Sequence, residues 1–489
     1  MSLTAARARS DAQPQTGRRL AVEPATLAVV ALTAFAFALR FSQIHQSLLG
    51  DEVFTYQDIH GRSFGAVLTT VHTGGENSPP LFFLLAWLTA KLGDATVWIR
   101  LPSVVLGAAT VPLVYVLGRQ TVGRLAGLTG AALFAISPFT VYYGSEARPY
   151  ATMTFFVALS TVALLRAVET RELPWWSLYV LAAVAAAYTH YTSVFVLVVQ
   201  GGWSIWRCRD RLRQPLIASA VAAVLYLPWL PQLRGKELGV IGGLYPLTAG
   251  NVVKDLVRWL VGYVWASLTQ IPGTWGLVVI GACLLAGLAA VLARWRRTGS
   301  PRPDWAASWL LIVALAVATP VGLLLYSIAA TDLWLPRGLS ASIPAAMLVI
   351  GALLVAVPGR ARIVAVGAVL VTLAVGTITS LGPDYVREPY RAMAAYVDQH
   401  ARPQDRVVVF SFIGQPAIAA MIHRPHPVLS PTGFKYDSVP HGAYLDLFLD
   451  DHVAQRLNLR PPHPAGFTLV SHTHYRGSLP TELLVYRRS

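Results

Sequence analysis

Long apolar runs separated by short polar stretches dominate this chain, and they predict membrane-spanning helices. A run of about 20 apolar residues is long enough to cross a bilayer. We find eleven such runs, several of them short, at roughly 22–44, 97–118, 124–143, 150–168, 175–189, 191–207, 215–232, 273–293, 306–329, 338–357 and 361–381. The runs at 79–93 and 251–265 are too short or too polar to span, and we expect both to lie on the outer membrane face as juxtamembrane helices.

Basic residues mark one side of the expected spans. They cluster in alternate connections, at Arg18/Arg19, Arg119/Arg124, Arg166/Arg171, Arg207/Arg209/Arg211/Arg213, Arg294/Arg296/Arg297 and Arg360/Arg362. Lys and Arg are enriched in cytoplasmic loops of membrane proteins. This pattern predicts a cytoplasmic N-terminus, and an odd number of spans then places the C-terminus outside the cytoplasm.

The character of the chain changes after about residue 382. "REPYRAMAAYVDQH" has the pattern of an amphipathic helix, and "RVVVFSF", "FTLVSH" and "ELLVYR" have the pattern of strands. We therefore predict a small extracytoplasmic α/β domain over 383–489. It follows a disordered cytoplasmic tail (1–21) and a membrane domain (22–382) whose first outer loop covers 51–95. The expected fold class is an all-α polytopic membrane protein with a small C-terminal α/β domain.

Composition supports a membrane protein and argues against nucleic-acid binding. The chain is 55% hydrophobic and only 13% charged, with a mean hydropathy of +0.52, whereas soluble domains carry roughly 25% charged residues. The net charge of +15 comes from clusters between apolar runs rather than from one basic surface. Cys208 and Cys283, in a basic loop and an apolar run, predict neither a disulfide nor a cysteine-based metal site.

Candidate site residues fall in five loops that the expected topology places on the outer face. Each residue alone has a plain structural explanation, as a solvated acid, an interfacial anchor or a hydrogen-bonded histidine. Their convergence on one face is better explained by a functional site. The residues are Asp51 and Glu52 in "SLLGDEVFTY", His72 and Glu76 in the same outer loop, Glu146, Arg148 and Tyr150 in "YYGSEARPYA", His190 and Tyr191 in "YTHY", and Arg337 in "TDLWLPRG".

These residue types suit transfer of a group from a lipid-linked phosphate to a hydroxyl. A carboxylate can accept the proton of a hydroxyl nucleophile, and arginines can bind a phosphate through two parallel hydrogen bonds. A juxtamembrane helix can hold a lipid chain beside the pocket. A single inverting displacement needs only one base and stabilisation of the leaving group. The cytoplasmic loops contain neither GxxxxGK[ST] nor GxGxxG, so a nucleotide-driven reaction on that side is not expected.

The order of several motifs resembles a known family. "GDEVFTY", "SPPLFFLLAWL", "IRLPSVVLGAATV", "SPFTVYYGSEARPYA", "YTHY" and "LPRGLSASIP" follow one another over residues 22–381. This order resembles the GT-C membrane glycosyltransferases, in particular the protein O-mannosyltransferase and lipid A aminoarabinose transferase family. The resemblance implies the GT-C fold and a polyprenyl-phosphate-sugar donor. It also implies a hexosyl or pentosyl (mannosyl-like) transfer at the outer face of the cell (plasma or inner) membrane, with a protein, lipid or polysaccharide as acceptor.

The resemblance also implies roles for individual residues. Asp51 would be the catalytic base with Glu52 beside it, and Arg337 would bind the donor phosphate. Arg100, which matches a family arginine, is expected to be structural. Some relatives use a metal ion, but the acids, His72 and His190 show no diagnostic spacing here, so a divalent metal stays possible and none is assigned. Substrate binding is assigned to His72, Glu76, Glu146, Arg148, Tyr150, His190, Tyr191 and Arg337.

Other functions remain open at this point. A transporter or flippase of a lipid-linked substrate would show repeats or broken helices with acids at the membrane midplane. An outer-face ligase or polymerase that transfers lipid-linked units to a polymer is a second alternative, and a scaffold or receptor that binds a partner through its C-terminal domain is a third. His472 and His474 in "SHTHY" would share one face of a strand, where we expect a solvated pair rather than a metal site.

Overall fold

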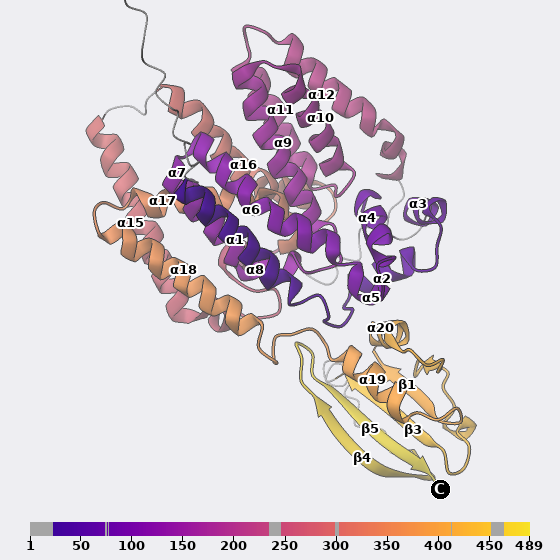
Figure 1. The fold of residues 1–489 in the computed structure, drawn as a ribbon. Coiled ribbons are helices and arrows are strands. Elements are labelled where there is room, and N and C mark those ends of the chain that lie inside the picture. Colours follow the sequence, from indigo (N-terminus) through magenta and orange to yellow (C-terminus); the bar gives the residue numbers. More distant parts are fainter. Residues whose placement is uncertain are drawn as a thin grey trace, which may run out of the picture.

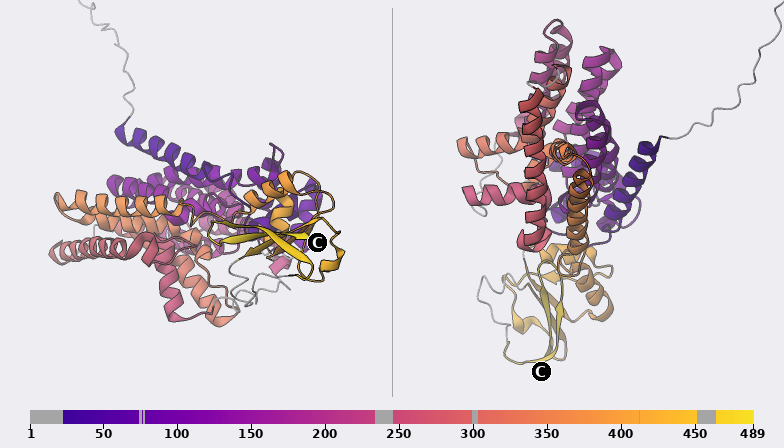
Figure 2. Two further views of the ribbon diagram at one scale, coloured as in Figure 1. Left: turned by 90° about the horizontal axis from the view of Figure 1, so that it is seen from below. Right: turned by 90° about the vertical axis from the view of Figure 1, so that its left-hand side faces the viewer.

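The computed structural model describes residues 23–73, 76, 78–233, 246–298, 303–411, 413–450 and 464–489. A bundle of long helices forms the larger part, and a small mixed α/β domain lies beyond one end of it (Figures 1 and 2). The expected disordered tail lies outside the described residues. The apolar helices of the bundle are α1 (Pro24–Phe41), α6 (Leu101–Thr121), α7 (Arg124–Ile136), α8 (Pro138–Tyr143), α9 (Tyr150–Thr170), α10 (Leu173–Ala187), α11 (Ser193–Arg207), α12 (Arg213–Tyr226), α15 (Thr274–Thr298), α16 (Pro303–Ala329), α17 (Ile343–Ala356) and α18 (Ala361–Ser380).

Each of the eleven expected spans contains helix, but the described helices do not all have the length to cross a membrane. Eight of them are long and apolar enough, and α7 and α10 are shorter apolar helices. The run expected at 124–143 is divided between α7 and α8, because Ser137 has an extended backbone (ψ 130°) before Pro138, and a residue before proline disfavours the helical conformation. The number of crossings therefore stays a prediction.

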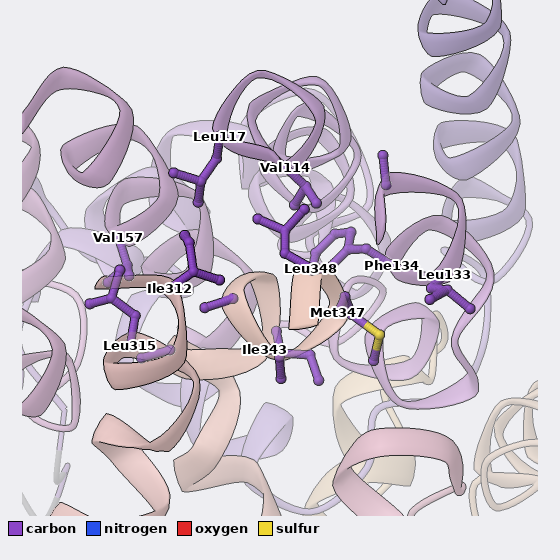
Figure 3. Close-up of a cluster of buried hydrophobic side chains, with 14 of the residues drawn as sticks. Val114, Leu117, Leu133, Phe134, Val157, Ile312, Leu315, Ile343, Met347 and Leu348 are labelled. Carbon is purple, nitrogen blue, oxygen red and sulfur yellow. The ribbon is translucent and has the colours of Figure 1, made fainter. Parts of the chain in front are cut away.

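The centre of the bundle is a dry core formed by α6, α7, α9, α16 and α17. Figure 3 shows the labelled side chains of this core between the ribbons of these helices. All of them are buried: Val114, Leu117, Leu133, Phe134, Val157, Ile312, Leu315, Ile343, Met347 and Leu348. A Cβ atom on Gly118 would come within 2.4 Å of the Gly127 Cα atom. Small residues of this kind let membrane helices approach closely, so α6 and α7 form a rigid support for the outer loops.

Short helices cover the end of the bundle that faces the C-terminal domain. These are α2 (Asp51–Ile59), α3 (Phe64–Thr73), α4 (Leu81–Ala90), α5 (Ala95–Trp98), η1 (Leu227–Leu233), α14 (Ala249–Val261), η2 (Thr269–Gly273) and η3 (Pro336–Ser342). The expected juxtamembrane runs at 79–93 and 251–265 thus form α4 and α14. In α14, Asp255 accepts a hydrogen bond of 3.1 Å from the indole of Trp334, which fixes the segment that leads into η3.

The described residues of the C-terminal domain form a five-stranded sheet, two α-helices and a short 3-10 helix, where the sequence predicted a small α/β domain. Its elements are α19 (Tyr390–His400), β1 (Arg406–Phe410), α20 (Gly414–Met421), β2 (Val428–Leu429), η4 (Tyr436–Ser438), β3 (Tyr444–Asp450), β4 (Phe467–Tyr475) and β5 (Thr481–Arg488). The strand order is β2-β1-β3-β5-β4. Strand β1 pairs in parallel with β2 and β3, whereas β5 is antiparallel to β3 and β4.

The core of this domain continues into the outer helices of the membrane domain. Met393 and Val397 of α19 belong to the same buried cluster as Val53 of α2 and Phe82 and Phe83 of α4. Helix α20 also packs against α2. The C-terminal domain is therefore docked on the helix that carries Asp51 and Glu52.

Candidate active site

Asp51 and Glu52 form the first turn of α2, immediately after Gly50. Gly50 has a φ of +53°, a conformation that glycine adopts at little cost, and it allows the chain to turn directly into the helix. Carboxylates in the first helical turn are favoured by the helix dipole. Consecutive helical residues point roughly 100° apart, so the two acids face different surroundings.

Asp51 points toward two arginines at a partly open position. The Nη1 atom of Arg337 donates to its Oδ2 atom at 2.6 Å, and the Nε atom of Arg148 lies 4.0 Å from the same oxygen. The Asp51 side chain is 30% exposed. Burial raises the pKa of Asp51, but the charges of Arg337 and Arg148 outweigh burial and lower the pKa below its usual value. Asp51 is therefore ionised at neutral pH and partly exposed.

Glu52 is fully buried and fully hydrogen-bonded. Arg100 donates to both of its oxygens, at 2.9 Å from Nε and 2.7 Å from Nη2, and Arg387 donates to Oε2. The backbone N–H groups of Ala147 and Leu49 donate to it as well. Burial raises the pKa of Glu52, but the two arginines and these hydrogen bonds bring it down to about 2. Glu52 is thus a buried anion that holds α2 to α6 and to the segment before α19.

Arg100 has the structural position that the sequence predicted for it. It lies at the N-terminus of α6, is fully buried, and donates to the carbonyl oxygens of Ile44, Gln46 and Ser47 in addition to Glu52. These contacts fix the connection between α1 and α2. The position of the Asp51 carboxylate therefore depends on an arginine that does not touch it.

Arg148 links the first outer loop to the loop between α8 and α9. Its Nη1 and Nη2 atoms donate to the two carboxylate oxygens of Glu76 at 3.0 and 3.1 Å. Nη1 also donates to the hydroxyl of Thr55 at 3.2 Å. Paired hydrogen bonds of this kind fix both position and orientation. Glu76 thus directs the guanidinium group toward Asp51.

Glu146 is a buried carboxylate in the same loop as Arg148. It is 7% exposed, and its Oε2 atom has no hydrogen-bond partner among the described residues. Burial and the negative charge of Glu52 raise the pKa of Glu146 to about 7. Its carboxyl group therefore exchanges a proton near neutral pH, unlike that of Asp51 or Glu52.

Tyr150 and His190 form the next part of the cluster. Their rings lie 5.3 Å apart, and the Nδ1 atom of His190 lies 3.0 Å from the hydroxyl of Thr192. Burial, together with the charges of Arg148 and Arg337, lowers the pKa of His190 to about 3. His190 is consequently neutral at physiological pH.

His72 and Tyr191 both contact Trp229, and they lie apart from the acid pair. Trp229 donates from Nε1 to the Tyr191 hydroxyl at 3.3 Å, and its ring lies edge-on to His72 at 5.6 Å. His72 also lies 2.7 Å from the side-chain amide of Gln232. These residues form a neighbouring part of the surface, connected through Trp229 rather than through Asp51.

Two buried arginines escaped the sequence analysis. Arg387 lies just before α19, in a stretch that reads as an ordinary amphipathic helix. Arg40 is a charged residue within the first apolar run, and this position could have marked it as a buried functional or structural group. Its guanidinium group donates to the carbonyl oxygens of Ala36 and Ala135 and to the hydroxyl of Thr140. A Cβ atom on Gly144 would come within 2.4 Å of the Arg40 Nε atom. Arg40 therefore supports the start of the loop that carries Glu146 and Arg148.

The described part of the chain contains no group of three or more Asp, Glu, His or Cys side chains arranged to hold a metal ion. Asp51, Glu52 and Glu76 each accept hydrogen bonds from arginine. His472 lies 3.3 Å from Glu482 on the neighbouring strand. Asp51, Glu52 and Glu76 are thus balanced by arginine side chains of the protein itself, whereas, within the described residues, Glu146 is not.

Comparison with known proteins agrees with this architecture. Residues 77–232 match the family model of dolichyl-phosphate-mannose-protein mannosyltransferases. The fold is similar to that of ArnT from Cupriavidus metallidurans in its apo state, with a TM-score of 0.54 and 16% identity over 94% of this chain and 98% of that chain. The same protein bound to undecaprenyl phosphate gives a TM-score of 0.53 and 14% identity over the same shares. None of the curated proteins matches this sequence closely enough to count as a relative.

The fold thus agrees with the class that the sequence resemblance implied. The protein has the fold of the GT-C membrane glycosyltransferases, and the resemblance seen in the sequence is confirmed. Within that class, the part of the chain from the first outer loop to η1 matches the mannosyltransferase family model. That part includes Glu146, Arg148, Tyr150, His190 and Tyr191.

Proposed function

We propose that this protein is an outer-face membrane glycosyltransferase that moves a sugar from a polyprenyl-phosphate donor to an acceptor hydroxyl, with inversion. The observation that carries the proposal is the Asp51 carboxylate, which is ionised, partly exposed and held between Arg337 and Arg148. An isolated solvated acid would not need two arginines. The ArnT structure with bound undecaprenyl phosphate supports a lipid phosphate as the ligand of such a site.

The proposed reaction is a single displacement. The Asp51 carboxylate accepts the proton of the acceptor hydroxyl, while the acceptor oxygen bonds to the anomeric carbon of the donor sugar. The bond from that carbon to the phosphate oxygen breaks, and polyprenyl phosphate leaves with the electron pair. One displacement at the anomeric carbon inverts its configuration. Arg337 hydrogen-bonds the leaving phosphate and stabilises its charge.

The contact between Arg337 and Asp51 makes the pKa of Asp51 depend on whether the donor is bound. In the structure Arg337 donates to Asp51 and helps to lower the pKa of Asp51. A donor phosphate that binds Arg337 would compete with the carboxylate for that guanidinium. The pKa of Asp51 would then rise toward or above its ordinary value, and the carboxylate would become a stronger base when the donor is in place.

The remaining residues have supporting roles in this proposal. Glu52 is enclosed on all sides and acts as a positioning residue for Asp51. Glu76 orients Arg148, and Glu146, Tyr150 and His190 belong to the same buried cluster as Asp51. His72 and Tyr191 contribute to the adjoining wall. The transferred sugar would be a hexose or pentose and the acceptor a protein, lipid or polysaccharide, at a plasma or inner membrane with the C-terminal domain outside.

The test is donor-dependent turnover by the purified full-length protein. The protein in liposomes receives a panel of polyprenyl-phosphate sugars with a membrane extract as acceptor source, and mass spectrometry measures released polyprenyl phosphate. We expect release from at least one donor, and release by the Asp51→Asn protein that is roughly 10²-fold slower or more. If no donor is consumed but a labelled lipid-linked sugar crosses the liposome membrane, the protein is a transporter and the proposal is wrong.

A further inference from the structure

A pocket lies between the membrane domain and the C-terminal domain. Its volume is about 490 Å³, within the range of roughly 300–1,000 Å³ that is typical of small-molecule sites. One wall comes from the C-terminal half of α2, the following turn and α4–α5. The other comes from the end of α20 and residues 422–423. Pockets at domain interfaces are common binding sites.

This pocket is separate from the Asp51 site but shares α2 with it. Tyr56 and Ile59 line the pocket, whereas Asp51 faces Arg337 and Arg148. Tyr56 follows Asp51 by five residues, which places it roughly 140° around the helix and about 7.5 Å further along its axis. A molecule in this pocket therefore lies behind α2, away from the reacting atoms.

The pocket has an excess of positive charge. Arg62 and Lys91 line it, both are exposed, and neither has an acidic partner within the described residues. Asp94, also in the lining, lies 3.6 Å from Arg391 and accepts hydrogen bonds from the backbone and hydroxyl of Thr96. The acid is thus balanced by its own neighbours, and the two cations remain available to an anionic group.

Aromatic faces accompany these cations. The Trp87 ring is fixed by a hydrogen bond of 2.8 Å from its Nε1 atom to the Arg62 carbonyl oxygen, and the Lys91 ammonium group lies 3.3 Å from the ring centroid. The Tyr56 ring is stacked on that of His60 at 4.5 Å. Lys91 thus lies over one face of Trp87, and His60 covers one face of Tyr56. Ordered aromatic rings beside cations suit a ligand that combines apolar faces with polar groups at its rim. A sugar ring has this character.

We propose that this pocket binds an anionic carbohydrate, a sugar chain that carries carboxylate or phosphate groups, as a remote part of the acceptor. Arg62 and Lys91 bind the acidic groups, and Tyr56 and Trp87 contact the ring faces. The C-terminal domain completes the pocket through α20, so acceptor selection requires both domains. The identification of the ligand as acceptor rests on the proposed transferase function, whereas the pocket and its charge do not.

Binding to the full-length protein tests the pocket without any donor. Isothermal titration in detergent compares tetragalacturonate, neutral maltotetraose and inorganic phosphate. We expect the acidic oligosaccharide to bind at least tenfold more tightly than either of the others. Equal affinity for the neutral sugar, or the same affinity for phosphate alone, would overturn the proposal, as would the absence of any binding.

Variants locate the binding within the molecule. We expect the double change Arg62→Gln/Lys91→Gln to weaken tetragalacturonate binding at least tenfold, and Ala420→Phe on α20 to block it by filling the pocket. Arg424→Gln is the matched control, because Arg424 is an exposed cation of the C-terminal domain that does not line the pocket. Unchanged affinity in the folded double variant, or an equal loss in the control, would overturn the proposal. Donor turnover is measured separately. Turnover without binding of the acidic sugar would contradict only the proposed ligand of the pocket. Binding of the acidic sugar without turnover would contradict only the proposed transferase function.

Discussion

Arg337 donates a hydrogen bond of 2.6 Å to the Oδ2 atom of Asp51, across 286 residues of sequence. The guanidinium group comes from η3, just before α17, and the carboxylate comes from the first turn of α2. The contact therefore joins an early and a late segment of the helical bundle. It also gives Arg337 two possible partners, the Asp51 carboxylate in the free protein and a donor phosphate in the proposed complex.

Two replacements of Arg337 should distinguish how much its charge and how much its paired hydrogen bonds contribute to donor affinity. Arg337→Ala removes both, and we expect it to weaken donor binding by about 2–5 kcal/mol, because a buried phosphate then lacks its partner. Arg337→Lys keeps the charge and loses only the paired hydrogen bonds, so its effect should be much smaller. The measurement is the affinity for a polyprenyl-phosphate sugar. Equal and negligible effects would make Arg337 an interfacial anchor.

Asp51→Asn should abolish most turnover while leaving the fold intact. Asparagine keeps the shape and hydrogen-bonding capacity but lacks the basic oxygen, so we expect a loss of roughly 10²-fold or more. The variant should insert normally and still bind donor. Glu52→Gln should reduce turnover less. The assignment of the base is wrong if Asp51→Asn retains near wild-type turnover while folded Glu52→Gln has none.

Arg387→Ala should destabilise the protein far more than Arg391→Ala. Removing one partner of a buried ion pair costs about 3–5 kcal/mol, and Arg387 and Glu52 are 3% and 0% exposed. Arg391 pairs with Asp94 at 3.6 Å in a much more exposed position, where such a pair is worth about 0–1 kcal/mol. Thermal unfolding in detergent gives the comparison. Similar shifts in Tm for the two variants would contradict it.

Glu146 should make stability fall as pH rises toward neutrality. Its pKa is raised to about 7 from the ordinary 4.5, so between these values the native protein holds a proton that the unfolded chain releases. The contribution of Glu146 to the free energy of unfolding is therefore greatest below about pH 4.5, and it decreases as the pH rises to about 7. Glutamine at 146 is neutral throughout, so Glu146→Gln should reduce the drop in Tm between pH 5.5 and 7.5. An unchanged pH profile would show that Glu146 does not carry the effect.

Cysteine labelling tests the predicted orientation of the chain. In a protein with Cys208 and Cys283 replaced by alanine, Ser471→Cys should react with an impermeant reagent from outside. Arg211→Cys and Arg297→Cys should react only from the cytoplasmic side. All three positions are exposed, whereas Ser145 is buried and unsuitable as a reporter. Labelling of position 471 from the cytoplasm would mean an even number of crossings.

Most helices of the bundle, together with α19, β1, β4 and β5, could be predicted because their signals are local, whereas α20, β2 and β3 were not predicted. Apolar length and the amphipathic period marked the membrane helices and α19, and alternation marked β4 and β5. The division between α7 and α8 was missed because the apolar run continues through Ser137 and Pro138, and only the backbone preference before proline ends the helix.

The sequence predicted that the site residues lie near one another, but it did not predict which of them form ion pairs. Asp51 and Glu52 are adjacent acids with the same sequence signal. Their difference arises from the helical angle between them and from partners that lie 48, 286 and 335 residues away. Arg387 gave no signal, because an arginine at the start of an amphipathic helix is ordinary until the fold places a buried carboxylate beside it.

The contact between Glu52 and Arg387 also sets an order of maturation during synthesis. The two residues are 335 positions apart, so at 5–20 residues per second the carboxylate is made roughly 17 to 67 s before its second guanidinium partner. During that interval the ribosome produces the rest of the membrane domain, and only Arg100 is available to Glu52. A chain released early would contain its membrane helices with α2 held from one side only. Completion of the site thus coincides with arrival of the segment that begins the C-terminal domain.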